Sequence, residues 1–413
     1  MDRRLLPPSL QALGLLGFGI AAAPLAGARA ERNASAEWSE GPRVAVSRPS
    51  GLASALEGQE KDADAPSRER EAARAALQRG LAWLATAAGT VPDGSLPRGG
   101  AEDPAPVAVT SLAALAWMAG GDGPGRGTHG AELGRAIDWI VAHTELDPRA
   151  EAPGYISENG DGLSRMHGHG LATLALAHAA ILSPKSERGA RIDRALRAAI
   201  GCIEKCQGVE GGWWYAPRKS LEHEGSITIC EVQALRAAHN AGFQVQPLTI
   251  GRALDYLARS QKEDGSFRYA LGDERSTLAL TAAAIATLNA AGKYEGKPLK
   301  DAYDYVFRGL SARETWIGRH PGNVLEDRRL PEERDARHAW CAYYERLYLA
   351  QALWQHPERD TFERWFAAEA KLVLTSQKPD GSWHDDRFGD VYATATNCLV
   401  LALPEGLLPI FQR

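Results

Sequence analysis

The chain has 413 residues and a net charge of −5, with 44% hydrophobic and 24% charged residues. This composition is typical of a globular protein long enough for one large domain or two ordinary ones. The charge lacks the basic excess that binding to nucleic acid or an anionic membrane requires, so neither partner is expected. No run of 18 apolar residues follows the N-terminal leader, so no transmembrane segment is expected after it.

The N-terminal segment has the three parts of a secretory signal peptide. Arg3 and Arg4 precede an apolar stretch from Leu10 to Leu25, and small residues up to Ala30 form a cleavage site. We therefore expect residues 1–30 to be removed and the mature chain to be periplasmic or extracellular. An uncleaved membrane anchor is the alternative. Residues 31–70 are rich in Ala, Ser, Glu, Arg and Pro without periodicity, which predicts a disordered spacer.

From residue 71 to 413 the apolar spacing predicts six helical hairpins. The second helix of each hairpin is rich in small residues, as in LALTAAAIATLNAAG, which suits close packing and burial. The first helices are expected at 72–88, 131–144, 190–206, 249–262, 298–311 and 360–377. The second helices are expected at 106–120, 167–182, 227–241, 276–291, 336–355 and 390–403.

Local signals support some of these boundaries. Thr228 and Glu231 have the spacing of a capping box, which predicts a helix start there. Gly242 and Gly292 follow expected helices, where a left-handed cap requires no side chain.

A glutamine-to-aromatic turn recurs at the end of the first helix. The fullest copy is Arg252-Ala253-x-x-Tyr256-Leu257-x-x-x-Gln261-x-x-x-Gly265-x-Phe267. Partial copies are Gln207-x-x-x-Gly211-x-Trp213 and Gln377-x-x-x-Gly381-x-Trp383, and Leu310 stands where a further unit would carry its glutamine. A fixed repeat of this length indicates an array of structural units.

This pattern resembles the QW repeat of the prenyltransferase and squalene oxidase repeat superfamily, over about residues 72 to 413. The resemblance implies an all-α fold, an α/α toroid in which the second helices form an inner ring and the first helices an outer ring. It implies that Gln261, Gln377, Trp213 and Trp383 are structural, because the glutamine bonds backbone of a neighbouring helix and the aromatic ring packs on the next unit. The chain is long enough for one toroid, as in protein prenyltransferase β-subunits, whereas squalene-hopene type cyclases use two.

The resemblance places a ligand cavity at one end of the inner ring, near the N-termini of the inner helices. Aromatic and polar residues in those stretches favour a largely apolar ligand with a few polar anchors. The expected ligand-binding residues are His167, His169, Trp214, Tyr215, Glu231, Tyr269, Trp340, Tyr344 and His384.

Cyclisation of a polyene requires a strong carboxylic acid among aromatic rings, which stabilise the cations that follow. Class II cyclases carry it in an Asp-x-Asp-Asp motif, which this sequence lacks. The nearest candidates for a displaced catalytic acid are Asp385, Asp386 and Asp390. His384 would orient the acid, and Trp214 and Trp340 would face the cation. Asp390 has a simpler interpretation as the N-cap of the last helix.

Other chemistries lack their signatures. The prenyltransferase zinc site requires an Asp-x-Cys that is absent, and Ala393 stands where its histidine would lie, so no cofactor or metal is expected. His167 and His169 share a face only in an extended loop and could hold a metal only there. Cys230 and Gln233 have thioester spacing without the glycine that shapes that motif. Cys202 and Cys206 have i, i+4 spacing, so their disulfide status stays open, and we favour buried free thiols.

The sequence therefore favours an exported, single-toroid relative of terpenoid cyclases that binds a hydrophobic small molecule, with an isoprenoid as the candidate ligand. One alternative is a divergent terpene cyclase of the isomerase class that uses the aspartates named above. The other is a scaffold that binds a protein or a glycan on its concave face.

Overall fold

The structure is a computed structural model, and it describes residues 65–97, 104–159, 161–162, 164–183, 186–319 and 341–408. These residues belong to one compact unit, Val44–Arg413. The predicted signal peptide, most of the predicted spacer and Trp340 lie outside the described residues. Among the described residues, no helix is long and apolar enough to cross a membrane.

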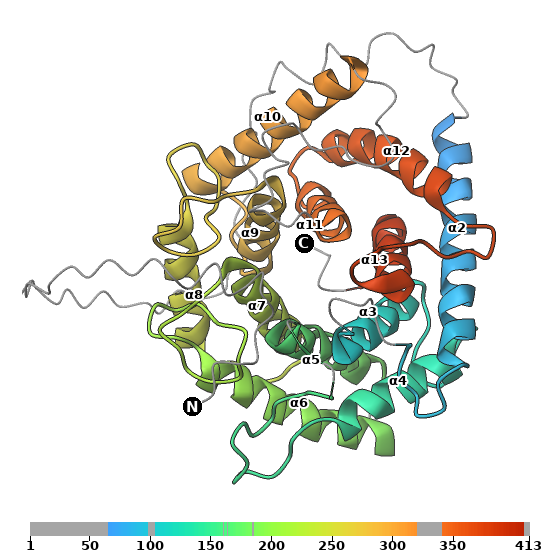
Figure 1. The fold of residues 1–413 in the computed structure, drawn as a ribbon, viewed down its shortest axis with the longest axis vertical. Coiled ribbons are helices and arrows are strands. Elements are labelled where there is room, and N and C mark those ends of the chain that lie inside the picture. The colour runs from blue at the N-terminus through green and yellow to red at the C-terminus, as the bar shows by residue number, and fades with distance from the viewer. Residues whose placement is uncertain are drawn as a thin grey trace, which may run out of the picture. The chain divides into compact units, whose positions relative to one another are not determined.

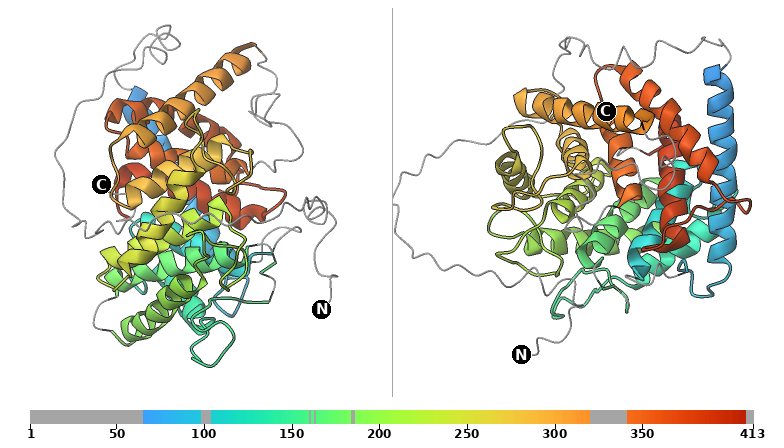
Figure 2. Two further views of the ribbon diagram at one scale, coloured as in Figure 1. Left: turned by 90° about the vertical axis from the view of Figure 1, so that its left-hand side faces the viewer. Right: turned by 45° about the horizontal axis from the view of Figure 1, so that its top comes forward.

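Helices in the described ranges form two concentric rings, as Figures 1 and 2 show. The outer ring contains α2 (Ala65–Ala88), α4 (Gly130–Ala142), α6 (Glu187–Cys206), α8 (Pro247–Ser260), α10 (Lys297–Arg319) and α12 (Arg359–Ser376). The inner ring contains α3 (Pro106–Ala119), α5 (Arg165–Leu182), α7 (Gly225–Asn240), α9 (Leu278–Ala290), α11 (Ala342–Trp354) and α13 (Gly389–Ala402). A short 3₁₀ helix, η3 (Leu403–Glu405), follows α13.

The inner ring is closed. Each inner helix contacts the next one along the chain, and α13 contacts α3, while in the outer ring α12 contacts α2. The predicted α/α toroid of six hairpins is therefore confirmed, and an open superhelix is excluded. An inner helix can pack against a neighbouring inner helix on each side because most of its side chains are small. In α9, for example, Ala282, Ala283 and Ala284 are all buried.

Most predicted helix boundaries lie within a few residues of those observed, with three differences. The predicted start of the helix at 336–355 lies outside the described residues, and α11 is described from Ala342. Helix α2 begins at Ala65, inside the range predicted as spacer, and α10 continues to Arg319. The capping box at Thr228 is wrong, because α7 begins at Gly225 and its N-cap is Glu224. The predicted left-handed caps at Gly242 and Gly292 are confirmed, with φ of 87° and 79°.

The glutamines join consecutive units of the outer ring, as the resemblance implied. Each Nε2 donates to the carbonyl of its own turn glycine and to a carbonyl in the next outer helix. For Gln207 that second acceptor is Thr249 (2.8 Å), for Gln261 it is Pro298 (2.7 Å), and for Gln377 it is Ala76 (2.9 Å). The last of these bonds closes the ring between α12 and α2.

The aromatic half of the turn is held by a threonine of the following inner helix, which the sequence interpretation missed. The backbone N–H groups of Trp213, Phe267 and Trp383 donate to hydroxyl oxygens of Thr228, Thr281 and Thr394, at 3.0 to 3.1 Å. The Asp93-Gly94-Ser95-Leu96 turn is a further copy, in which the Leu96 N–H donates to Thr110. These bonds fix each outer helix to its inner partner.

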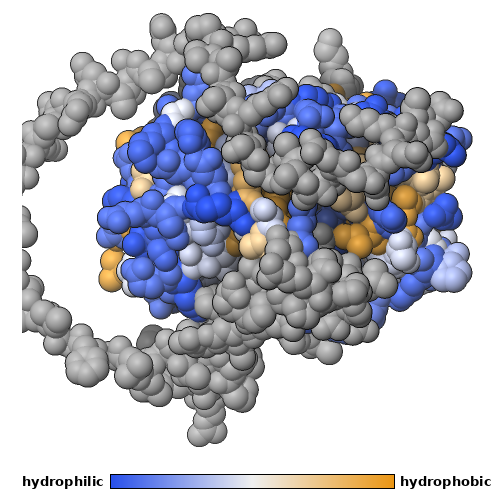
Figure 3. Space-filling model, turned by 90° about the horizontal axis from the view of Figure 1, so that it is seen from above, coloured by the Kyte–Doolittle hydropathy of each residue, from blue (hydrophilic) through white to orange (hydrophobic). Residues whose placement is uncertain are grey.

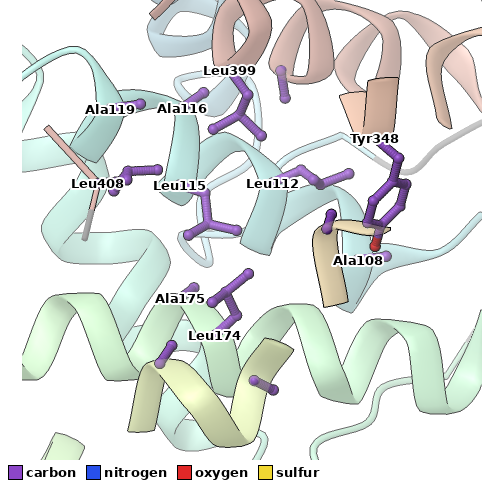
Figure 4. Packing of buried hydrophobic residues seen from close by; sticks show 14 of the residues in the cluster. Ala108, Leu112, Leu115, Ala116, Ala119, Leu174, Ala175, Tyr348, Leu399 and Leu408 are labelled. Carbon is purple, nitrogen blue, oxygen red and sulfur yellow. The ribbon is translucent and has the colours of Figure 1, made fainter. Parts of the chain in front are cut away.

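Apolar side chains fill the centre of the inner ring (Figure 4). Leu112 and Leu115 of α3, Leu174 of α5 and Leu399 of α13 are buried there. Tyr348 lies near the N-terminal end of α3, and Leu408, from the segment after η3, lies near its C-terminal end. Leu408 thus packs at the end of the inner ring that lies opposite the N-terminus of α3. In Figure 3, hydrophilic residues dominate the visible described surface, with apolar residues between them.

Candidate functional site

One histidine and four tyrosines with partly exposed side chains lie at the N-terminal ends of the inner helices. They come from the start of α5, from the turns that precede α7 and α9, and from the first turns of α11 and α13. We call this set the tyrosine mouth; its members are His167, Tyr215, Tyr269, Tyr344 and Tyr392.

One half of the tyrosine mouth is a chain of ring contacts. The ring of His167 meets the ring of Tyr215 edge-on at 5.9 Å between centroids. The Tyr215 hydroxyl is 2.8 Å from the Tyr269 hydroxyl. Trp214 lies beside this pair, with its ring 5.0 Å from that of Tyr215. The predicted ligand-binding residues of α5, the α7 turn and the α9 turn are therefore neighbours.

The other half is built by α11 and α13. The Tyr344 ring lies 4.5 Å from that of Tyr348, which reaches the apolar centre. Phe388 packs edge-on against Tyr392 at 5.2 Å. Cys341, the N-cap of α11, adds to the rise that burial causes in the pKa of Tyr215, Tyr344 and Tyr392, so it lies within electrostatic range of both halves.

The tyrosine mouth is largely uncharged at neutral pH. Burial lowers the pKa of His167 to about 4, so its imidazole is neutral. Burial raises the pKa of Tyr344 and Tyr392 well above the ordinary value, so both hydroxyls stay protonated. Within the described ranges the Tyr344 hydroxyl is buried and has no hydrogen-bond partner. That hydroxyl is therefore available as a polar anchor in an otherwise apolar wall.

A hydrogen-bonded chain runs from the tyrosine mouth to a buried carboxyl. His167 Nε2 is 2.8 Å from Ser226 Oγ, which donates to Glu224 Oε2 at 2.5 Å. Glu224 also accepts the N–H groups of Ser226 and Ile227, as the N-cap of α7. Burial raises the pKa of Glu224, and its carboxyl is an electrostatic neighbour of Tyr215, Tyr269 and Tyr344.

Glu224 and Ser226 were not predicted as site residues. The signal was a Glu-x-Ser pair three residues after Leu221, but the helix start had been placed at Thr228. With α7 beginning at Gly225, the pair stands at the helix N-terminus, beside the tyrosine mouth.

Two predicted ligand-binding residues lie away from the tyrosine mouth. His169 Nδ1 accepts the N–H of Ile156 at 3.1 Å, which is the bond that a threonine makes in the other units. Glu231 is fully buried, with Cys202 and Cys206 of α6 as electrostatic neighbours. Burial raises its pKa well above the ordinary value. His169 therefore points toward the loop that precedes α5, and the Glu231 carboxyl lies close to Gly170 of α5.

The acidic turn before α13 forms its own cluster. His384 Nδ1 is 2.5 Å from Asp390 Oδ1, and its Nε2 is 2.8 Å from Asp386 Oδ1. These two aspartates raise the pKa of His384 by hydrogen bonding. The side chain of Asp386 is 95% exposed, and that of Asp390 pairs with Lys378 at 3.0 Å.

Asp385 accepts backbone N–H groups of its own turn, those of Arg387 and Phe388. The N-cap of α13 is Phe388, so the interpretation of Asp390 as N-cap is wrong, and Asp390 lies in the first turn. Asp390 also lines a surface pocket of about 390 Å³ between α2 and α13, together with Trp83 and Thr86. Asp386 and Asp390 thus lie at the outer rim, whereas Asp385 is an electrostatic neighbour of Tyr392, a member of the tyrosine mouth.

The directions of the side chains argue against a metal site shared by His167 and His169 and against a thioester between Cys230 and Gln233. His167 and His169 lie on α5 and reach different partners, Ser226 and Ile156. Gln233 donates to Gln351, whereas the Cys230 thiol faces the His167 carbonyl at 3.6 Å, so no thioester arrangement is present. Among the described residues, no three His, Cys, Asp or Glu side chains are placed to share a metal ion.

Comparisons with known proteins agree with this architecture. No protein-family model matches the sequence, and no curated protein matches it either. A solved D-mannose isomerase has a TM-score of 0.53 and 11% identity, covering 80% of this chain and 96% of that one. A variant of the type II terpene cyclase MstE from Scytonema, in complex with merosterolic acid A, has a TM-score of 0.51 and 15% identity. That match covers 83% of this chain and 99% of the cyclase.

An inactive variant of the alpha-1,6-mannanase GH76A of Salegentibacter sp. HEL1_6, in complex with alpha-1,6-mannotriose, has a TM-score of 0.51 and 8% identity. It covers 82% of this chain and 99% of the mannanase. At these identities the likeness concerns the fold: the chain has the α/α toroid that terpene cyclases and sugar-active enzymes share.

Proposed function

We propose that the protein binds a largely apolar small molecule, an isoprenoid in the first place, in the tyrosine mouth. The observation that carries the proposal is the buried Tyr344 hydroxyl without a partner in an otherwise apolar, uncharged wall. Ligand sites are typically apolar clefts with a few placed polar groups. A glycan would need many polar groups, whereas here Tyr215, Tyr269 and His167 already bond to protein partners.

Binding of a dansyl-labelled C15 isoprenoid alcohol tests this proposal. Tyr344→Phe removes only the hydroxyl, so we expect the affinity to fall about 2- to 13-fold, the value of one hydrogen bond. Cys341→Trp places a large ring at the N-cap of α11, three residues before Tyr344, and should abolish binding by crowding the tyrosine mouth. Thr86→Trp fills the pocket between α2 and α13 and is the matched control, expected to bind normally. Equal loss in the control, or none in Cys341→Trp, would place the ligand elsewhere.

A second candidate function is proton-transfer chemistry on such a ligand, of the cyclase or isomerase class. One observation supports it: the Glu224 carboxyl, whose protonated form burial favours, lies among tyrosine rings and contacts partly exposed Ser226. In this scheme the protonated Glu224 would give its proton to Ser226 Oγ as the Ser226 hydroxyl proton passes to an alkene carbon, and the Glu224 carboxylate would take up the proton that the cation later loses. His167 would hold Ser226 in place. The rings would stabilise the resulting cation.

The two candidate catalytic acids, Glu224 and an aspartate of the turn before α13, lead to different expected results. If Glu224 supplies the proton, Glu224→Gln should abolish formation of a cyclic product from squalene, and Asp386→Asn should leave it unchanged. If an aspartate of the turn before α13 supplies it, as the sequence alone suggested, the outcomes reverse. Absence of any product with wild-type protein, together with normal isoprenoid binding, would leave ligand binding as the function.

A further inference from the structure

A surface pocket of about 390 Å³ lies where α2 and α13 pack side by side (Figure 1), and none of its lining residues belongs to the tyrosine mouth. Its volume falls in the range of about 300–1,000 Å³ that small-molecule sites occupy. Much of its wall is apolar, formed by the partly buried ring of Trp83 and by the buried side chains of Ala87 and Val391. The pocket therefore offers a face on which the hydrocarbon part of a ligand can pack.

The polar side chains of this wall present acceptors. Thr86 and Thr90 donate their hydroxyl protons to backbone carbonyls of α2, at 3.1 and 2.7 Å, so toward a ligand their oxygens act as acceptors. Trp83 donates its indole N–H to Asp380. The third polar side chain of the wall is that of Asp390, whose carboxylate accepts and does not donate. A ligand that matches this wall must therefore bring the donors.

The pocket also lies in an acidic environment. Asp390 Oδ1 is 2.5 Å from His384 Nδ1, and its Oδ2 is 3.0 Å from Lys378 Nζ. A carboxylate has about four lone-pair sites, so about two remain for a ligand. Asp380 and Asp386 add two further carboxylates beside these two basic groups. Three carboxylates thus face two basic groups, and this excess of negative charge favours a cationic ligand.

We propose that the pocket between α2 and α13 is a binding site for a small alkylammonium ion. The ammonium group donates to Asp390 and to a threonine hydroxyl oxygen, and the alkyl chain packs on the Trp83 ring. A neutral sugar fits less well, because its hydroxyl groups need donors as well as acceptors and the polar side chains of this wall supply acceptors. An anion is disfavoured by Asp390 itself.

Isothermal titration calorimetry of the full-length chain with pentylamine, 1-pentanol and pentanoate tests the proposal. These probes share one hydrocarbon chain and differ in the charge of the head group. We expect pentylamine to bind at one site per chain, at least about 10-fold more tightly than the other two, which is the value of one charge-assisted hydrogen bond.

Three variants locate the site. Thr86→Trp fills the pocket and should abolish binding of pentylamine. Asp390→Asn removes the charge without changing the shape and should lower the affinity about 10-fold. Asp386→Asn is the matched control: it removes an exposed carboxylate of the same turn that does not line the pocket, and it should change the affinity less than about 3-fold.

The pH dependence separates binding by charge from binding by the apolar wall. Hydrogen bonds to Asp390 and Asp386 raise the pKa of His384 above its ordinary value of 6.5, with Lys378 nearby and the Tyr343 hydroxyl on the His384 carbonyl. Above that raised pKa the imidazole is neutral, and Asp390 keeps one cationic partner. Pentylamine, which stays protonated as a lysine does, should therefore bind more tightly at pH 8.5 than at pH 6, and 1-pentanol should not.

Circular dichroism would verify that the variants are folded. Equal affinities for the three probes would overturn the proposal, as would unchanged binding in Thr86→Trp or wild-type protein that does not bind pentylamine. Binding of methyl α-mannoside that Thr86→Trp abolishes, in a chain that does not bind pentylamine, would assign the pocket to a neutral sugar instead.

Discussion

Replacing Gln377 with alanine tests how far the closure of the ring contributes to stability. Gln377 is the last of the three repeat glutamines, and its side chain bonds to α2, the first helix of the outer ring. Its Nε2 donates to the Ala76 carbonyl and to the Gly381 carbonyl, both at 2.9 Å, and Arg79 donates to its Oε1. Gln377→Ala removes all three bonds without changing the backbone.

The expected loss follows from the hydrogen bonds. Each contributes about 0.5–1.5 kcal/mol net, and a buried carbonyl left without a partner costs about 1–3 kcal/mol. Because Gln377 is only partly buried, water replaces some of the lost hydrogen bonds. We therefore expect the free energy of unfolding to fall by about 2–3 kcal/mol. For the roughly 310 described residues, with an unfolding entropy of about 2.1 cal/mol/K per residue, a loss of 3 kcal/mol lowers Tm by about 5 °C.

Chemical denaturation monitored by far-UV circular dichroism measures this loss. Gln261→Ala removes the same two Nε2 bonds between units that are adjacent in sequence, and it should destabilise similarly. Gln78→Ala changes an exposed residue of α2 and should cost less than about 0.5 kcal/mol. If Gln377→Ala behaved like Gln78→Ala while Gln261→Ala were costly, the contact between the last and first units would contribute nothing, and the reasoning would be refuted.

Three further predictions follow from the same contacts. A Cβ at Gly80 would come within 2.5 Å of a neighbouring sulfur, so Gly80→Ala should cost about 1–3 kcal/mol by denaturation, whereas Gly251→Ala has open space and should be neutral or stabilising. His169→Ala should lose about 1–3 kcal/mol by leaving the Ile156 N–H unpaired, and His169→Thr should restore part of it; unchanged stability in both would indicate that the bond to His169 contributes nothing. Burial lowers the pKa of His178 to about 4, below the value of about 6.5 in the unfolded chain, so its stabilising contribution is complete above pH 6.5 and is lost as the pH falls toward 4. Between pH 7.5 and 5 the wild type should therefore lose about 2 kcal/mol more stability than His178→Leu, and equal losses would contradict the assignment.

The fold was predictable because its repeat has a local physical cause. Three units end their outer helix with a glutamine and a positive-φ glycine, and in each of them the glutamine Nε2 donates to the glycine carbonyl, at Gly211, Gly265 and Gly381. Such signals are short-range and visible in one sequence. The threonines that complete the turn lie 11 to 15 residues further on, in an Ala-rich helix where a threonine is not distinctive.

The site was predictable only in part, because it depends on side-chain direction. His167, Tyr215, Tyr269 and Tyr344 were found from their position before or within inner helices. The same reasoning chose His169 and Glu231, which lie away from the tyrosine mouth. On a helix, neighbouring positions point about 100° apart, so an error of a few residues in the start of α7 changes which carboxyl reaches the mouth. Glu224, missed in this way, lies there in place of Glu231.

The most direct test of ligand binding at the tyrosine mouth is photoaffinity labelling of the full chain. A diazirine-bearing C20 polyprenyl alcohol would be bound, irradiated and located by peptide mass spectrometry. The account predicts labels in the first turns of α5, α11 and α13, around His167, Tyr344 and Tyr392. Labels confined to the outer helices or to the pocket between α2 and α13 would contradict it.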